Sequence, residues 1–250
     1  SASAFFLGLD SLMGELPILL LTLVGGVIAD RKDRRQLLLM SQYTQMATAF
    51  ALALLVYLDV IQVWHVLALS AVTGVAQAFG GPAYQSLIPQ LVSKENLPNA
   101  IALNSIQFNL ARIIGPLIAG AALAAFGMVA CFGLNGVSFL FVIAALFALQ
   151  VKHIPPAATR PIMDEMKGGL NYVKADSTLV ALTVLGFVAA FLGLPLLTFL
   201  PIIVKDVFQQ DVGLYTRLMA FSGSGAVLGA MMVAWRGKSR AMGRSLLGGI

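Results

Sequence analysis

Apolar runs of about 20 residues, the length that a helix needs to cross a lipid bilayer, recur along the whole sequence. Hydrophobic residues make up 59% of the 250 residues and charged residues 11%, against about 25% charged in an ordinary soluble domain. This pattern excludes a water-soluble domain and predicts an all-α polytopic membrane protein. We expect about seven spanning helices and the start of another near residue 245. The seven apolar runs are 11–29, 37–58, 64–89, 100–126, 129–150, 178–203 and 213–235.

The basic residues predict how these helices are oriented. If successive connections alternate between two sides of a membrane, one side receives almost all of the Lys and Arg residues, and the other receives Lys205. Because cytoplasmic loops are rich in positive charge, the basic side is cytoplasmic and the first helix of this chain runs inward. An odd number of helices, most simply one, is therefore expected before it. The basic residues on this side are Arg31, Lys32, Arg34, Arg35, Lys94, Lys152, Arg160, Lys167, Lys174, Arg236, Lys238, Arg240 and Arg244.

The connection after the first run reads GVIADRKDRR and combines a glycine, an acid and several arginines. A glycine there permits close approach of two helices. An acid in a basic loop can pair with arginines in one conformation and release them in another. Simple topogenic charge is the alternative, but it explains only the arginines. The candidate gating residues are Gly26, Asp30, Arg31, Arg34 and Arg35.

This loop resembles the signature loop of the major facilitator superfamily, which joins the second and third of twelve helices. Asp33 stands where the family usually has glycine. A second stretch, Pro82 to Gly120, is similar to the connection between the fourth and fifth helices in a bacterial efflux branch of drug and siderophore exporters. The resemblance implies a major facilitator-type bundle, truncated here to about seven of twelve transmembrane helices plus the start of another.

The predicted fourth helix carries a polar face inside the membrane. Ser105, Asn109 and Arg112 recur at helical spacing, with Asn104 and Gln107 beside them. At about 1.5 Å per residue, Arg112 lies near the bilayer midplane, where an uncompensated charge costs about 2.5–3.5 kcal/mol. We expect this face to line a cavity, although a structural ion pair between helices is an alternative.

Other residues of the same helix and of the first helix complete the candidate sites. Gly115, Pro116 and Gly120 offer a kink and a small packing surface. The resemblance associates the Gly-Pro element with antiporters. Glu15 is placed about one turn inside the first helix on the outer side, either as a proton-exchanging carboxyl group or as an interfacial carboxylate.

The chain is predicted to divide at a proline-containing linker. Residues 1–151 form an N-terminal transmembrane bundle without its first helix, and residues 178–250 begin a C-terminal bundle. The linker, 152–177, contains Pro155, Pro156 and Pro161, followed by an amphipathic helix from about Ile162 to Lys174 along the cytoplasmic surface.

Catalytic motifs are absent from the sequence. It has no phosphate-binding glycine loop, no His-Glu-x-x-His and no credible Ser-His-Asp set, and its single cysteine and two histidines do not make a metal site. We expect no enzyme activity, no cofactor, no metal, no nucleic-acid partner and a monomer embedded in the lipid bilayer.

The resemblance implies a function in transport. It points to a secondary active transporter of the bacterial inner membrane: a proton-coupled exporter of drugs, siderophores or other small amphipathic molecules that works by alternating access. A metabolite uptake carrier of the same superfamily and a non-transporting membrane scaffold or sensor are the alternatives.

Overall fold

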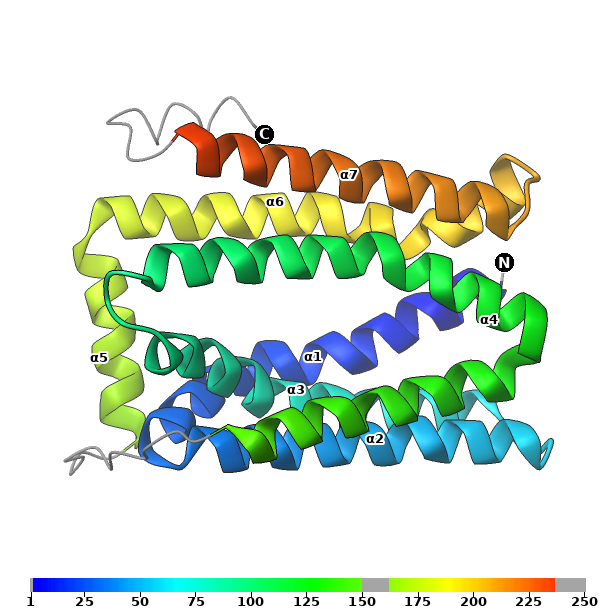
Figure 1. Cartoon of the computed structure of the whole chain (residues 1–250), viewed down its shortest axis with the longest axis horizontal. Helices are drawn as coiled ribbons and strands as arrows, with labels where there is room; N and C mark the ends of the chain where they lie inside the picture. Colours follow the sequence, from blue (N-terminus) through cyan, green and yellow to red (C-terminus); the bar gives the residue numbers. More distant parts are fainter. Residues whose placement is uncertain (1, 150–161, 237–250) are drawn as a thin grey trace.

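The computed structural model describes residues 2–149 and 162–236 (Figure 1). These residues form helices and no strand, which confirms the predicted all-α class. The predicted linker prolines and the apolar run near 245 lie outside the described residues. The elements are α1 (Ala2–Arg31), α2 (Arg34–Tyr57), α3 (Val63–Leu91), α4 (Leu97–Ala148), α5 (Ile162–Ala175), α6 (Ser177–Ile202), the π-helix η1 (Ile203–Val207) and α7 (Val212–Arg236).

Helix lengths agree with a protein that crosses a membrane several times. Five helices in the described parts are long and apolar enough to span a bilayer: α1, α2, α3, α4 and α6 extended by η1. The chain is therefore a multi-pass membrane protein. We place α7, with its 25 residues, at the seventh predicted run.

α4 is two membrane spans in one element. Its 52 residues would extend about 78 Å, more than twice the hydrocarbon thickness of about 30 Å. The helix breaks at Gly127, where φ is 77° and ψ is −176°. Residues other than glycine rarely adopt this backbone conformation. The break falls between the predicted runs 100–126 and 129–150, which confirms them as separate spans, and the two halves form the hairpin in Figure 1.

α3 packs against both α1 and α2, and small residues make these contacts close. A Cβ atom on Gly25 of α1 would overlap the backbone oxygen of Ala78 on α3, and one on Gly74 of α3 would overlap that of Gly14 on α1. Apolar lipid offers no hydrophobic drive for helix association, so membrane helices rely on such close van der Waals packing.

The two halves of α4 have different neighbours. The second half, 128–148, returns along α2, where Gly136 faces the ring of Phe50. On the first half, 97–126, Gly120 lies in ordinary contact distance of Thr216 on α7. α4 therefore joins the α1–α3 bundle to the start of the next group of helices. α5 lies across one end of the molecule and contacts α1 and α6 (Figure 1).

The predicted start of the first helix was wrong, and the difference changes the position of Glu15 within the helix. The first helix starts at Ala2, not at residue 11, because the apolar residues before Asp10 continue the helix. The Asp10 carboxylate does not end it, since it accepts a hydrogen bond from the Ser70 hydroxyl on α3. A buried polar group with a partner is tolerated where an unpaired one is costly.

Candidate functional site

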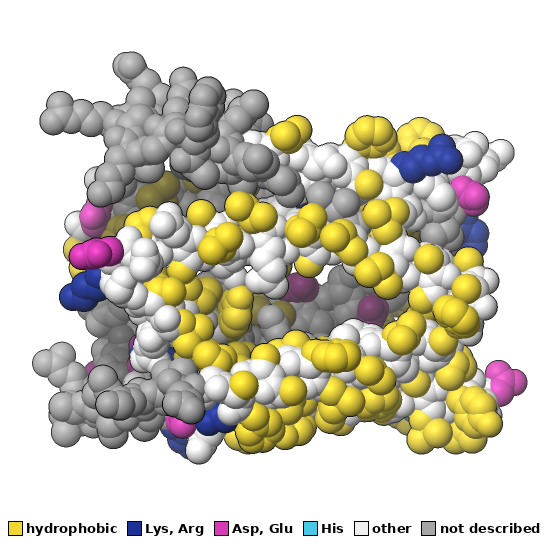
Figure 2. Space-filling view, in the orientation of Figure 1, with side chains coloured by type: hydrophobic (Ala, Val, Ile, Leu, Met, Phe, Trp, Pro, Cys, Tyr) yellow, Lys and Arg dark blue, Asp and Glu magenta, His cyan; other side chains and the backbone are white. Residues whose placement is uncertain are grey.

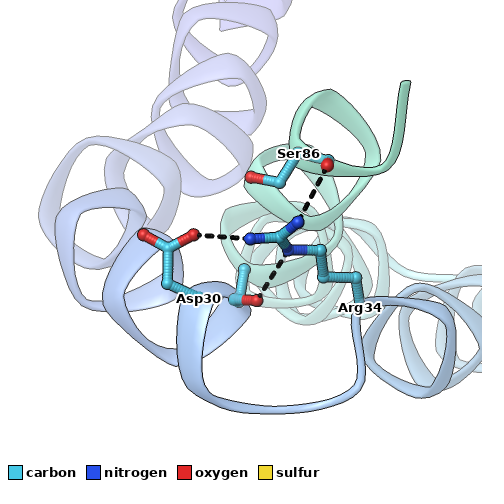
Figure 3. Close-up of polar contacts among 4 residues, drawn as sticks. Asp30, Arg34 and Ser86 are labelled. Atoms are coloured by element: carbon cyan, nitrogen blue, oxygen red, sulfur yellow. Dashed lines mark hydrogen bonds and ion pairs between the residues drawn. The ribbon is translucent and has the colours of Figure 1, made fainter. Parts of the chain in front are cut away.

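Arg34 ties three helices together at the end of the bundle where α1 meets α2 (Figure 3). Its Nη2 atom lies 3.1 Å from Asp30 Oδ1, and its Nε atom donates to the backbone oxygen of Ala29 at 3.2 Å. Its Nη1 atom donates to the backbone oxygen of Ser86 on α3 at 3.1 Å. The guanidinium at the start of α2 thus holds the end of α1 against α3. Because the basic connections predict that this end is cytoplasmic, we call this set the cytoplasmic clasp.

Arg35 makes a second connection from the same turn. Its Nε and Nη2 atoms donate to the backbone oxygens of Leu146 and Phe147, at 2.5 and 2.9 Å. Its guanidinium carbon lies 5.6 Å from the centre of the Phe147 ring. The last carbonyls of a helix lack intrahelical donors and carry partial negative charge, so a cation there is favourable. Arg35 therefore fixes the end of α4 to the start of α2.

The acidic residues of the loop have separate structural tasks. Asp33 accepts hydrogen bonds from the backbone N–H groups of Arg35 and Gln36 and so caps the N-terminus of α2. Its φ is −61°, so this turn requires no glycine at the position where the resemblance described above implies one. Asp30 is the partner of Arg34.

The close helix approach expected at Gly26 occurs one residue earlier. A Cβ atom at Gly26 would meet no described atom within 4 Å, whereas one at Gly25 would overlap the α3 backbone. Two adjacent glycines lie on different faces of a helix, 100° apart, and only tertiary structure decides which one is in contact.

Arg112 lies midway along the first half of α4, 15 residues from Leu97 and 15 from Gly127. Its side chain is exposed, and within the described parts of the chain it has no recorded hydrogen bond or ion pair. Figure 2 shows the molecule hollowed between this half of α4 and the α1–α3 bundle, with acidic side chains visible in the hollow. A charge at this depth is far less costly toward a polar hollow than toward lipid.

Glu15 lies farther from the start of its helix than the sequence predicted. Because α1 runs from Ala2 to Arg31, Glu15 is near its midpoint rather than one turn from the outer end. It lies 16 residues from Arg31, or about 24 Å, and Arg112 lies about 23 Å from the start of α4. The two opposite charges therefore lie about equally far along their helices from the ends that are predicted to be cytoplasmic. Glu15 is exposed and has no recorded partner among the described residues.

The remaining polar residues of α4 do not form one cluster with Arg112. Asn104 accepts a 2.6 Å hydrogen bond from the hydroxyl of Tyr84 on α3, nearer the cytoplasmic end. Asn109 donates to the backbone oxygen of Ser105 within its own helix at 2.8 Å. Gln107 is exposed. Asn104 and Arg112 are eight residues apart, about 12 Å along the helix axis. The polar residues therefore extend along the helix and do not form a single site.

The predicted packing element of α4 is only partly in contact. Backbone angles stay helical through Gly115 and Pro116, and the break in α4 lies at Gly127. In the described structure a Cβ atom at Gly115 would meet nothing within 4 Å, while one at Gly120 would lie 3.8 Å from Thr216 Oγ1 on α7.

A polar seam between α2 and α3 was not predicted from the sequence. Buried Ser41 donates to the backbone oxygen of Ala76 at 2.8 Å, and Gln45 donates to Ser41 Oγ at 3.0 Å. The hydroxyls of Thr48 and Thr73 lie 3.1 Å apart. The signal was present, because Ser41, Gln45 and Thr48 recur at i, i+4 and i+7 in an otherwise apolar run.

The sequence of the chain is similar to those of several bacterial transporters. The family model described as transmembrane secretion effector, of the major facilitator type, matches residues 1–244. The staphyloferrin A transporter of Staphylococcus aureus is 24% identical over 92% of the chain, and macrolide efflux protein A of Streptococcus pyogenes is 24% identical over 93%. The enterobactin exporter of Shigella boydii is 27% identical over 66%.

These relatives are longer than the chain. The aligned part covers 58% of the staphyloferrin A transporter and of macrolide efflux protein A, and 39% of the enterobactin exporter. The chain therefore spans rather more than half the length of the first two relatives.

Proposed function

Because the chain belongs to the transmembrane secretion effector family of the major facilitator superfamily, we propose that the full-length protein is a proton-coupled exporter of small amphipathic molecules. Drugs and siderophores are the substrate class suggested by the names of its relatives. The observation that carries this proposal is the pair of exposed, opposite charges, Glu15 and Arg112, about equally far from the predicted cytoplasmic ends of helices that border a hollow.

The two charges have complementary chemistry. A carboxyl group can bind and release a proton, and a guanidinium stays protonated. In this proposal Glu15 carries the proton and Arg112 attracts an anionic or polar group of a substrate, from α1 and α4, two helices that do not contact each other in the described structure. Substrate and proton then compete within one hollow, which is the requirement for exchange.

The cytoplasmic clasp supports alternating access. Its bonds join α1, α2 and α3 at one end of the bundle, and Asp30 is an exposed acid bound to Arg34 by a single 3.1 Å contact. An exposed ion pair contributes little stability, so it can be exchanged for other partners during a rigid-body movement. In this proposal the clasp holds one of two states, and the hollow opens to alternate sides.

The test is transport by the full-length protein in inside-out vesicles. A panel of dyes, macrolides and siderophores is offered with and without an imposed proton gradient, beside vesicles that carry the Arg112→Ala variant. We expect accumulation that disappears when the gradient is collapsed or Arg112 is replaced. Accumulation in right-side-out vesicles instead would identify an uptake carrier, and no flux from a folded protein in either orientation would contradict transport.

A further inference from the structure

α1, α2 and α3 line an apolar groove of about 540 Å³ that is separate from the hollow beside α4. Two hydroxyl side chains also line it, but both donate to backbone oxygens: Ser41 to Ala76 at 2.8 Å and Thr44 to Met40 at 2.9 Å. Neither hydroxyl hydrogen is left for a polar ligand. The apolar lining includes Ile28, Leu37, Met40, Val72, Val75 and Phe79.

The groove spans the depth of one leaflet. The bond between Arg34 and the backbone oxygen of Ser86 sets the level of the cytoplasmic end on α2 and α3. From Ser86, Phe79 is about 10 Å and Val72 about 21 Å along α3, while half of the hydrocarbon core is about 15 Å thick. At the end of the groove that is predicted to be cytoplasmic, Ile28 and Leu37 lie within one turn of the α1–α2 connection. The groove thus extends from the cytoplasmic surface to near the bilayer centre.

The connection next to the groove residues Ile28 and Leu37 carries a net positive charge. The segment 30–35 has four basic and two acidic residues. Arg34 and Arg35 are bound in the clasp and to the end of α4, and Asp33 is the cap of α2. Lys32 is exposed in the connection itself. A cationic side chain at this depth attracts the phosphate of an anionic lipid.

We propose that this groove binds one anionic phospholipid of the cytoplasmic leaflet, with an acyl chain against Val72, Val75 and Phe79 and the headgroup phosphate at Lys32. Three features support this occupant: the lining is apolar with its hydroxyls satisfied, its extent along α3 is comparable to the thickness of one leaflet, and one end lies beside the basic connection 30–35. The proposal rests on membrane embedding and is independent of which molecule is transported.

The test measures lipid retention by the full-length protein. Vesicles contain spin-labelled phosphatidylglycerol or spin-labelled phosphatidylcholine, and electron paramagnetic resonance gives the motionally restricted fraction. Val75→Trp fills the groove, and Val137→Trp is its matched control, since both valines are 41% exposed and Val137 lies on the second half of α4. We expect Val75→Trp to release about one phosphatidylglycerol per protein and Val137→Trp to release none.

A second pair of variants tests the headgroup. Lys32→Ala should reduce the preference for phosphatidylglycerol over phosphatidylcholine by about twofold or more, and Lys94→Ala, an exposed cytoplasmic lysine in the next basic connection, should leave it unchanged. Val72→Phe is a milder filler that serves if Val75→Trp fails to fold. Equal release by the groove and control variants would overturn the proposal. Loss of substrate transport with unchanged lipid retention would also overturn it, because the groove would then belong to the substrate.

Discussion

Glu15 and Arg112 are the residues on which the proposed exchange of substrate and proton depends. Both are exposed in the described structure although each lies near the middle of a membrane-length helix. Charged side chains at this depth normally face a protein interior or a water-filled cavity. In the proposed function these two side chains therefore face the transport path or the helices that complete it.

Replacing Glu15 with glutamine should uncouple transport from the proton gradient. The amide has nearly the shape of the carboxyl group but cannot exchange a proton at physiological pH. We expect gradient-driven accumulation in inside-out vesicles to fall to the level seen without a gradient, while substrate binding to the purified protein persists. Asp59→Asn is the control, because Asp59 is an exposed acid outside the spans with a φ of 55°, which asparagine also tolerates. Full coupling in Glu15→Gln would exclude Glu15 as the proton carrier.

Arg112 should be more important for transport than for folding. Arg112→Ala removes a charge whose insertion costs about 2.5–3.5 kcal/mol, so the thermal stability of the purified protein should be retained or raised while flux is lost. Arg112→Lys keeps the charge without the planar fork and should keep part of the flux. Arg217→Ala, an exposed arginine near the start of α7, is the control that should leave transport intact. A loss of stability in Arg112→Ala would instead assign the arginine to a structural ion pair.

At the scale of elements, Gly25 and Gly26 form a natural matched pair. Gly25→Ala should destabilise the α1–α3 contact by about 1–3 kcal/mol, because the added methyl group overlaps the backbone at Ala78. Gly26→Ala should be neutral for stability, since no described atom lies within 4 Å of its Cβ position. Thermal unfolding of the purified full-length protein separates the two. Equal destabilisation would mean that Gly26 packs against a helix outside the described residues.

The comparison of these glycines shows what the sequence could predict about elements. Apolar runs predicted the positions of the five spans found in the described residues, because the bilayer imposes a length rule on single helices. The direction of each span stays a prediction from the basic loops. The break in α4 at Gly127 was also predicted as the gap between two runs. Two other features depend on where α1 begins and how it packs. These are the identity of the glycine that touches α3 and the position of Glu15 near the middle of the helix. The sequence predicted a helix start next to Asp10, but Asp10 lies inside that helix and its carboxylate is hydrogen-bonded to Ser70.

At the scale of the whole molecule, the candidate site is predictable only in part. Repeated polar residues on α4 indicated a polar face, and the structure separates Asn104, which is bound to Tyr84, from Arg112, which has no recorded partner among the described residues. In the seam of Ser41, Gln45 and Thr48, the spacing of the polar side chains is visible in the sequence, but the backbone oxygen of Ala76 that accepts from Ser41 is not. Contacts to backbone oxygens, including all those of Arg35, require the tertiary structure.

The clasp makes a prediction about the balance between the two states of the complete transporter. Arg34→Ala removes the bonds that join α1, α2 and α3 at the cytoplasmic end, so the population should shift toward a state with a cytoplasmic opening. A cysteine placed at exposed Gln107, in a Cys131→Ala background, reports that opening through labelling by an impermeant maleimide in inside-out vesicles. We expect faster labelling with Arg34→Ala.

Lys94→Ala is the control for charge, because it removes a cytoplasmic cation that takes part in no recorded contact within the described residues. It should leave the labelling rate unchanged if the clasp geometry, and not the positive charge of the surface, sets the balance. An equal increase of the labelling rate in both variants would mean that Arg34 acts only through its positive charge. Because a ligand shifts an equilibrium only by its differential affinity for the two states, an Arg34→Ala transporter already biased toward the cytoplasm should also bind substrate from that side more tightly.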